Sequence, residues 1–203
     1  MSGAGRDGAP SPRRLVIVPY DPAWPAEFAW VGRALRKALG ERALRIDHIG
    51  STAVPGLAAK DVVDVQVTVA ALDPVAIGAA LEAVGCAPRP DITGDHRPPG
   101  AAADPAEWRK LYYTPPPGWR PTHLHVREAG RANQRYALLF RDYLRSAPAA
   151  AEAYRQVKEA LARLHPTDAD AYYDVKDPVC DLIADAAERW AAATGWQPGP
   201  SDA

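Results

Sequence analysis

The segment 63–69 reads Val-Asp-Val-Gln-Val-Thr-Val, so valines alternate with polar residues along its whole length. Because successive side chains of a β-strand point to opposite faces of a sheet, this period predicts a strand with one apolar and one polar face. Such a strand packs against a core on its apolar side only, and its polar side can line a cleft. Asp64 lies on the polar side. A carboxylate buried there needs a partner, either a salt bridge with Lys60 or an arginine, or a metal ion.

The segments before and after this strand show helical or strand-like periodicity of their own. Apolar residues recur at helical spacing from Trp24 to Leu39, and Asp73 followed by Pro74 is typical of a helix start. Residues 86–107 are rich in proline, glycine and aspartate, which predicts a long mobile loop. The remaining predicted elements are strands over 15–18, 44–49, 109–114 and 122–127, and helices from about Arg131 onward, the last of them beginning near Asp177 and Pro178.

A run of strands followed by a run of helices predicts an α+β fold with a mixed sheet and a C-terminal helical portion. The length of 203 residues suits one well-buried domain. We assign this domain to residues 14–195 and predict disordered tails over 1–13 and 196–203.

Composition excludes several classes of protein. A formal net charge of −1 argues against a general nucleic-acid binder, which normally carries a strong basic excess. No run approaches the roughly 20 apolar residues of a membrane span, and residues 1–13 lack the apolar stretch of a signal peptide. The two cysteines, Cys86 and Cys180, form no metal or redox spacing, so we expect a reducing, cytoplasmic setting.

Gly50 and Ser51 directly follow the strand predicted over 44–49. Glycine lets the backbone turn sharply and approach a ligand, and serine offers a hydroxyl and an amide to a phosphate oxygen. An ordinary turn is the alternative, since both residues are common in turns. However, Asp64 follows after one short connector, and the Mg²⁺ that phosphoryl and nucleotidyl transfer require prefers carboxylate oxygens. The combination indicates a nucleotide-handling site.

His123 and His125 alternate around Leu124, so both imidazoles point to one face of their predicted strand, which we expect Asp64 to share. Together with His48 they suit a transition metal. They can equally contact phosphate, act as acid and base, or form only structural hydrogen bonds. The spacing by itself does not decide among these roles.

Basic residues are frequent in the second half of the chain. Guanidinium groups suit polyphosphate because they present a fork of donors, although a solvated helix surface explains most of these arginines equally well. The arginines between residues 109 and 145 are Arg109, Arg120, Arg127, Arg131, Arg135, Arg141 and Arg145.

The chain resembles the GrpB family, which is described as nucleotidyltransferase-like. The resemblance covers roughly residues 15–190, and its most specific part is the block Gly-Ser-Thr-Ala-Val-Pro-Gly-Leu at 50–57. The matching residues are Val18–Pro25, Phe28, His48–Lys60, Asp64, Arg109, Lys110, His123–Val126, Phe140–Arg145, Tyr154, Lys158, Tyr172 and Lys176.

The resemblance implies a fold similar to the polymerase-β-type nucleotidyltransferases. Gly50 and Ser51 match the glycine-serine pair of that superfamily, and Asp64 matches its first metal-binding carboxylate. The chain departs from the pattern at Gln66, where a second carboxylate is expected, and at His123 and His125, which stand on the strand that would offer a third. The family is also associated with dephospho-coenzyme A kinase domains through fusion, which points to nucleotide or coenzyme metabolism.

We therefore expect a nucleotide-dependent transferase that acts on a small molecule, with Mg²⁺ or Mn²⁺ as cofactor and a nucleoside triphosphate such as ATP as substrate. The alternatives are a non-catalytic nucleotide-binding or regulatory module, favoured by Gln66, and an enzyme of other chemistry with a transition metal on aspartate and histidine. Catalytic roles are expected for Asp64, His123 and His125, metal binding for the same three residues and His48, and nucleotide or phosphate contacts for Gly50, Ser51, Thr52, Lys60, Arg109, Lys110, Arg141 and Lys176.

Overall fold

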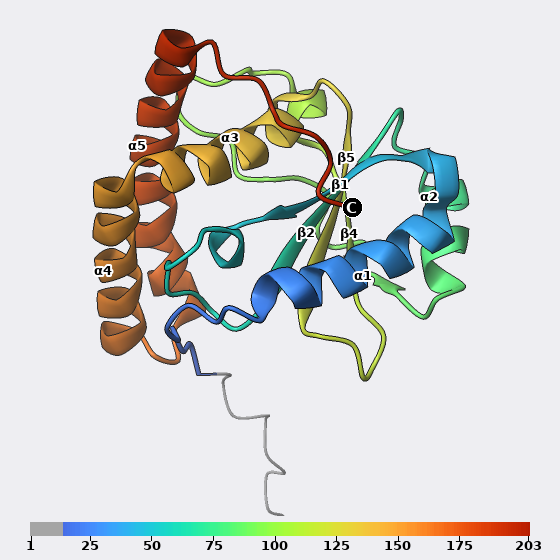
Figure 1. Ribbon diagram of the computed structural model, residues 1–203, viewed down its shortest axis with the longest axis horizontal. Coiled ribbons are helices and arrows are strands. Elements are labelled where there is room, and N and C mark those ends of the chain that lie inside the picture. The colour runs from blue at the N-terminus through green and yellow to red at the C-terminus, as the bar shows by residue number, and fades with distance from the viewer. Residues whose placement is uncertain (1–13) are drawn as a thin grey trace, which may run out of the picture.

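The computed structural model describes residues 14–203, so the tail predicted over 1–13 lies outside the described residues. A five-stranded sheet in the order β1-β2-β5-β4-β3 lies between two layers of helices (Figure 1). The strands are β1 (Ala43–Ile49), β2 (Val63–Val69), β3 (Ala87–Pro88), β4 (Leu111–Thr114) and β5 (Thr122–Glu128). The α-helices are α1 (Trp24–Leu39), α2 (Pro74–Glu82), α3 (Ala132–Ser146), α4 (Pro148–Leu164) and α5 (Ala169–Thr194).

The sheet is mixed, because β2 and β5 run parallel while β1 and β2, β5 and β4, and β4 and β3 pair antiparallel. The predicted α+β fold with a mixed sheet, flanking helices and a C-terminal helical portion is therefore confirmed. Of the strand predicted over 15–18, only a single bridge between Val18 and Ala59 is present.

The alternation in β2 produces the two faces expected from the sequence. Val63, Val65 and Val67 are fully buried in a core shared with α1 and α2. Helix α1 has the predicted bounds and supplies Phe28 and Leu35 to the same core. Burial of side chains of this size contributes roughly 1.5–3 kcal/mol each, so the valine face holds the sheet against α1 and α2.

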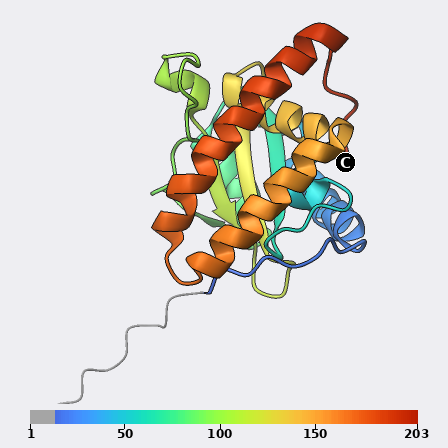
Figure 2. The same ribbon diagram turned by 90° about the vertical axis from the view of Figure 1, so that its left-hand side faces the viewer.

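The polar face of the sheet is covered by α3, α4 and α5, and Figure 2 shows α4 and α5 crossing in front of the strands. Helix α5 begins at Ala169, after Asp168, whose carboxylate accepts a hydrogen bond from the Ala171 amide. The predicted start near Asp177 and Pro178 is therefore wrong. Proline usually ends a helix because it lacks an N–H. Here the helix continues through Pro178, and burial of Tyr172 before it and Cys180 after it offsets the lost hydrogen bond.

The first half of the predicted mobile loop over 86–107 is hydrogen-bonded to β4 and to the residues just before it, which corrects the prediction there. The Asp95 amide donates to the Trp108 carbonyl, and the Lys110 amide donates to the Thr93 carbonyl. Residues 105–108 form a short 3-10 helix, and Trp108 is buried. Proline and glycine predict an irregular backbone here, but an irregular backbone can still be fixed by hydrogen bonds.

Residues 196–203 also differ from the predicted disordered tail. They return to β1, where the Ile46 amide donates to the Ser201 hydroxyl and the His48 amide donates to the Asp202 carboxylate. The Ala203 amide donates to the Ile46 carbonyl, and Figure 1 shows this segment beside β1. Residues 196–203 thus hydrogen-bond backbone groups of β1 at the edge of the sheet. Unpaired backbone groups at such an edge can pair with another chain. Within the described residues, no helix combines the length and the apolar character needed to cross a membrane.

Candidate functional site

A cavity of about 470 Å³ lies between the polar face of the sheet and the three C-terminal helices. The sheet contributes Asp64, His123 and His125, and the helices contribute Lys158 and Lys176. The cavity is therefore built from segments more than 100 residues apart in sequence. Its walls also include aromatic rings, namely those of Trp108, Tyr112, Tyr136, Phe140, Tyr154, Tyr172 and Tyr173.

Parallel pairing of β2 with β5 brings the predicted acidic and imidazole groups together. Asp64 pairs with His123 and Gln66 with His125, so these side chains share one face of the sheet. The Nδ1 atom of His123 lies 2.9 Å from Asp64 Oδ1, and Nε2 of His125 lies 4.0 Å from the same oxygen. Burial raises the pKa of Asp64, but the hydrogen bond from His123 and the nearby imidazoles outweigh burial and lower it. The carboxylate is therefore ionised and ready to bind a cation.

Gly50 allows Asp64 to reach its position. Its φ is +70°, and a Cβ atom on residue 50 would overlap the Asp64 carboxylate. Residue 50 must therefore adopt a left-handed backbone conformation and leave space for the Asp64 side chain of the neighbouring strand, and glycine meets both conditions.

The variant Gly50→Ala is expected to destabilise the protein by more than about 1 kcal/mol and to displace Asp64. Gly56→Ala is the matched control, since Gly56 has a φ of +79° but nothing within 4 Å of the added methyl group. Both variants carry the backbone strain, and only the first moves the carboxylate. Urea denaturation and metal titration of the two proteins measure the difference. Equal losses of metal affinity in both would contradict this role of Gly50.

His48 does not join this cluster, which corrects its assignment as a metal ligand. Its partner in the sheet is Val65, so its ring points to the valine face and stacks on Phe28 at 4.8 Å between centroids. Burial lowers the pKa of His48 to about 4. The His48 Nε2 atom hydrogen-bonds the Thr52 hydroxyl at 2.9 Å. Thr52 lines the cavity, but its hydroxyl already forms this hydrogen bond with His48.

A second charged network stands beside the cluster and is centred on Asp95, which was not predicted. Its carboxylate accepts from Lys110 Nζ at 2.7 Å, from Arg127 Nε at 2.8 Å and from Asn133 Nδ2 at 2.9 Å. Burial raises the pKa of Asp95, but Arg127 and Lys110 outweigh burial and hold it far below its usual range. The sequence signal that could have indicated Asp95 is indirect. Lysine and arginine on the polar face of a buried sheet require a negative partner.

The same network determines the protonation of His125. Its Nδ1 atom lies 3.2 Å from Lys110 Nζ and 3.3 Å from Arg127 Nη2, and both of these groups are donors. The Nδ1 atom must therefore accept, so the proton of the neutral ring sits on Nε2. Burial, followed by the charges of Arg127 and Lys110, lowers the pKa of His125 well below its ordinary value. His125 is neutral at physiological pH.

Gln66, at the expected position of a second carboxylate, is engaged within the protein. Its Oε1 atom accepts from Arg127 Nη1 at 2.6 Å, and its Nε2 atom donates to the Gln134 carbonyl at 3.1 Å. The Arg127 guanidinium group thus occupies the position beside Gln66 where a second metal ion would need a carboxylate ligand.

Lys60, from the segment before β2, and two lysines of the helices also line the cavity. The Nζ atom of Lys60 donates to the Tyr173 hydroxyl at 2.6 Å and lies above the Tyr172 and Tyr173 rings. Lys176 donates to Asp177 at 3.3 Å. Lys158, which was not among the predicted site residues, donates to Ser51 Oγ at 2.9 Å and to the Ala58 carbonyl at 2.5 Å. Burial, followed by the charge of Lys176, lowers the pKa of Lys158 to about 7.

Two predicted phosphate-binding arginines do not line the cavity. Arg109 is exposed, and its backbone carbonyl accepts from Asn133. Arg141 is buried and donates to the His48 carbonyl at 2.9 Å and to Asp202 at 2.7 Å. Arg141 thus joins α3 to the edge strand, and neither arginine is placed to contact a ligand in the cavity.

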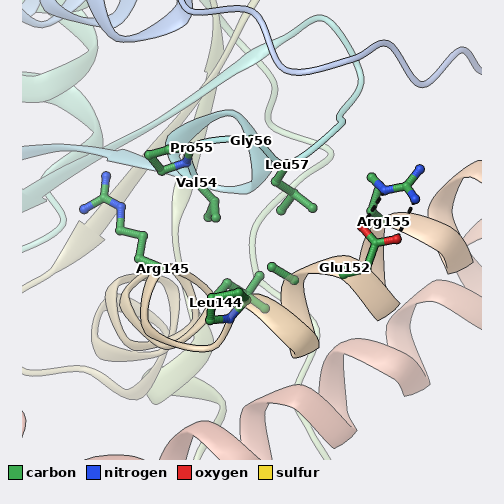
Figure 3. Close-up of a pocket in the computed structure, with 10 residues that line it drawn as sticks. Val54, Pro55, Gly56, Leu57, Leu144, Arg145, Glu152 and Arg155 are labelled. Atoms are coloured by element: carbon green, nitrogen blue, oxygen red, sulfur yellow. Dashed lines mark hydrogen bonds and ion pairs between the residues drawn. The ribbon is translucent and has the colours of Figure 1, made fainter.

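Figure 3 shows a second pocket, of about 360 Å³. Residues Val54–Leu57 form one wall, and Leu144 and Arg145 form the facing wall. Arg155 at its rim is paired with Glu152. None of the catalytic, metal or phosphate contacts predicted from the sequence lines this pocket, so the first cavity is the candidate site.

The donor atoms of Asp64, His123 and His125 lie within 4.8 Å of one another, a separation that suits one metal ion. The donor set of one oxygen and two nitrogens suits a transition metal such as manganese better than Mg²⁺, which prefers oxygen ligands. His123 is the better imidazole ligand of the two, because the second ring nitrogen of His125 faces cationic donors instead of the usual acceptor.

The profile of the GrpB protein family matches residues 14–186. A protein named dephospho-CoA kinase from Mycolicibacterium paratuberculosis is 40% identical, over 95% of this chain and 50% of that protein. UPF0157 protein PA4798 from Pseudomonas aeruginosa is 40% identical over 73% of this chain and 57% of its own length. The crystal structure of conserved protein GrpB from Enterococcus faecalis is 31% identical, has a TM-score of 0.70 and matches 86% of this chain and 99% of that one. The chain spans about half the length of the first curated relatives it matches.

Proposed function

The chain belongs to the GrpB family, and from that premise we propose that it is a nucleotide-dependent transferase whose cavity holds a nucleotide together with one divalent metal ion. The observation that carries the proposal is the make-up of a single cavity. A carboxylate and two imidazoles from the sheet, the lysines Lys60, Lys158 and Lys176, and several aromatic rings line it together. A nucleotide needs these three kinds of contact, to a metal ion, to its phosphates and to its base.

Asp64 and His123 would hold the metal ion, with His125 completing the set once Lys110 and Arg127 withdraw from its second nitrogen. The bound ion would neutralise phosphate charge and orient the phosphoryl group. His123 donates from Nδ1 to Asp64, which leaves its Nε2 atom free to accept a proton when no metal is bound. The same two residues therefore support metal binding and acid–base chemistry.

The part of the cavity lined by α4, α5 and the segment between β1 and β2 would bind the phosphates. Lys60 and Lys176 line it, and the Ser51 hydroxyl is presented beside Lys158. Charge-assisted hydrogen bonds from these groups favour a polyphosphate over a neutral ligand. The stacked rings of Tyr136 and Phe140, with centroids 5.8 Å apart, offer an apolar surface to a base or another flat group. Relatives named dephospho-CoA kinase add the expectation of a nucleotide or coenzyme ligand.

The site is expected to bind one metal ion per chain. Two-metal catalysis needs ligands for a second ion, and here Gln66 is neutral and bonded to the Arg127 guanidinium. Titration with Mn²⁺ in the presence of a non-hydrolysable ATP analogue should therefore saturate at one equivalent by electron paramagnetic resonance. Saturation at two equivalents would contradict this assignment of Arg127.

A non-catalytic nucleotide-binding module is the second candidate, and the bond between Gln66 and Arg127 favours it because it removes a ligand for a second metal ion. The two functions separate in one experiment. The protein is incubated with each nucleoside triphosphate and Mn²⁺ or Mg²⁺, and the nucleotide is followed by ³¹P NMR. Metal-dependent consumption supports the transferase. Binding without consumption, across a panel of small-molecule acceptors, supports the module.

A transition-metal enzyme of other chemistry is the third candidate, favoured by the two imidazoles. It predicts stoichiometric manganese, zinc or nickel in protein purified without added metal, together with no change in stability on addition of any nucleotide. Elemental analysis and thermal denaturation measure these two properties. The transferase instead predicts a rise in melting temperature with nucleotide, because a ligand that binds the native state stabilises it.

A further inference from the structure

The lysine of α4 has an unusual environment. Lys158 is 2% exposed, and its Nζ atom donates only to neutral oxygens, those of Ser51 and Ala58. The Tyr154 ring lies 4.6 Å from the same nitrogen. Among the described residues no carboxylate lies within salt-bridge distance of Lys158. A buried ammonium group without a counter-charge is costly, so this position is suited to an anion that the protein does not itself supply.

The groups around Lys158 come from every neighbouring element. Lys176 and Cys180 face it from α5, Asp64 acts on it from β2, and Glu159 is its neighbour on α4. Lys176 is paired with Asp177, and Glu159 is paired with Arg155. Neither of these carboxylates is therefore free to serve as the counter-charge of Lys158.

Tyr172 supplies an independent sign of a missing ligand. Its side chain is fully buried and lines the same cavity, yet its hydroxyl oxygen has no hydrogen-bond partner among the described residues. A buried hydroxyl without a partner costs free energy. Together, Ser51, Lys158, Lys176 and Tyr172 present donors to this part of the cavity.

We propose that Ser51, Lys158, Lys176 and Tyr172 form a site for a phosphate group, and that above neutral pH Lys158 takes up a proton from solvent when the phosphate binds. The inference rests on the proposed function, in which the phosphate belongs to a nucleotide, although a free pyrophosphate presents the same chemistry. The proton adds to the amine lone pair, and the resulting ammonium group is the counter-charge of the anion.

The direction of the linkage follows from the pKa of Lys158. Burial lowers this pKa to about 7 in the free protein, and a neighbouring phosphate raises it. Well below pH 7 the amine is already protonated and binding takes up no proton. At pH 8 it is mostly neutral, so binding takes up close to one proton, about 0.9 for a pKa of 7.

Isothermal titration of pyrophosphate, and separately of ATP, into the full chain with saturating Mn²⁺ tests this inference. Each titration is run in Tris and in HEPES, because the difference in heat between buffers of different ionisation enthalpy counts the protons. Lys158→Met should lose the uptake at pH 8 and weaken pyrophosphate binding by about tenfold or more, as expected for loss of a charged hydrogen bond. Lys37→Met is the matched control: it removes an exposed lysine of α1 that does not line the cavity, and it should keep both the uptake and the affinity.

Proton uptake by wild type that is large at pH 8 and absent at pH 6, and that Lys158→Met loses, supports the inference. The wild-type pH dependence stands even if the variant folds poorly. Equal heats in both buffers at pH 8, or the same uptake in Lys158→Met, overturn it while leaving the proposed function intact. Uptake with pyrophosphate but no binding of ATP supports the phosphate site and contradicts the nucleotide function. No binding of either probe overturns both.

Discussion

Replacement of Asp64 by asparagine is expected to weaken metal-dependent nucleotide binding by at least about 100-fold, since loss even of groups that only support metal ligands costs 10–100-fold. The change removes the negative charge and keeps the shape of the side chain. An asparagine oxygen can still accept the hydrogen bond that His123 now donates at 2.9 Å. Isothermal titration of Mn²⁺ and of ATP with Mn²⁺ measures the loss.

The matched control for this prediction is Asp61→Asn. Asp61 belongs to the same segment but does not line the cavity, and its carboxylate accepts from Trp24 Nε1 at 2.9 Å and from Arg120. Its replacement should leave the affinities for metal and nucleotide within a factor of two or so of wild type, because it lies outside the site. An Asp64→Asn protein that binds Mn²⁺ and nucleotide as tightly as wild type would exclude Asp64 as a metal ligand.

Asp95→Ala is expected to destabilise the fold by about 3–5 kcal/mol, the usual effect of removing one partner from a buried ion pair. Lys110 and Arg127 are 8% and 5% exposed and share this one carboxylate. Without it, two cations remain buried beside each other. Urea denaturation measures the change. Asp91→Ala is the matched control, since Asp91 lies in the same loop with its partner Arg89 in solvent, and no resolved change is expected.

The contribution of Asp95 also has a defined dependence on pH. The folded-state pKa of Asp95 is depressed, so its stabilisation is fully present above the unfolded pKa of about 4 and is lost as the pH falls below it. Asp95→Ala should therefore show a shallower loss of stability between pH 5 and pH 3 than wild type. Parallel curves for the two proteins, or a destabilisation no larger than that of Asp91→Ala, would contradict the assigned network.

Local patterns predicted the elements that local chemistry determines. The valine alternation of 63–69 and the helical spacing of 24–39 both appear with their expected bounds, and Asp73 caps α2 through the amides of residues 75 and 76. The shared face of Asp64, His123 and His125 was also expected, because each lies on the polar side of its own strand. Period and capping are properties of neighbouring residues, so the sequence carries them directly.

The errors arose where distant segments meet. His48 was grouped with Asp64, but the antiparallel register of β1 and β2 sets His48 opposite Val65, and a register one residue different would have reversed its face. Asp95 stood in a segment that looked irregular, and only the fold brings it to Lys110 and Arg127. Lys158 lies in a segment whose apolar spacing is typical of any amphipathic helix, so the sequence did not single it out. Its burial depends on how α4 packs over Ser51.

The most direct test of the proposed function is a crystal of the full chain soaked with Mn²⁺ and a non-hydrolysable ATP analogue, with diffraction data collected at the manganese absorption edge. We predict one anomalous peak within bonding distance of Asp64 and His123, with the phosphates of the analogue extending toward Ser51 and Lys158. A peak elsewhere, or a nucleotide bound outside the cavity, would contradict the proposal that the metal ion and the nucleotide share this site.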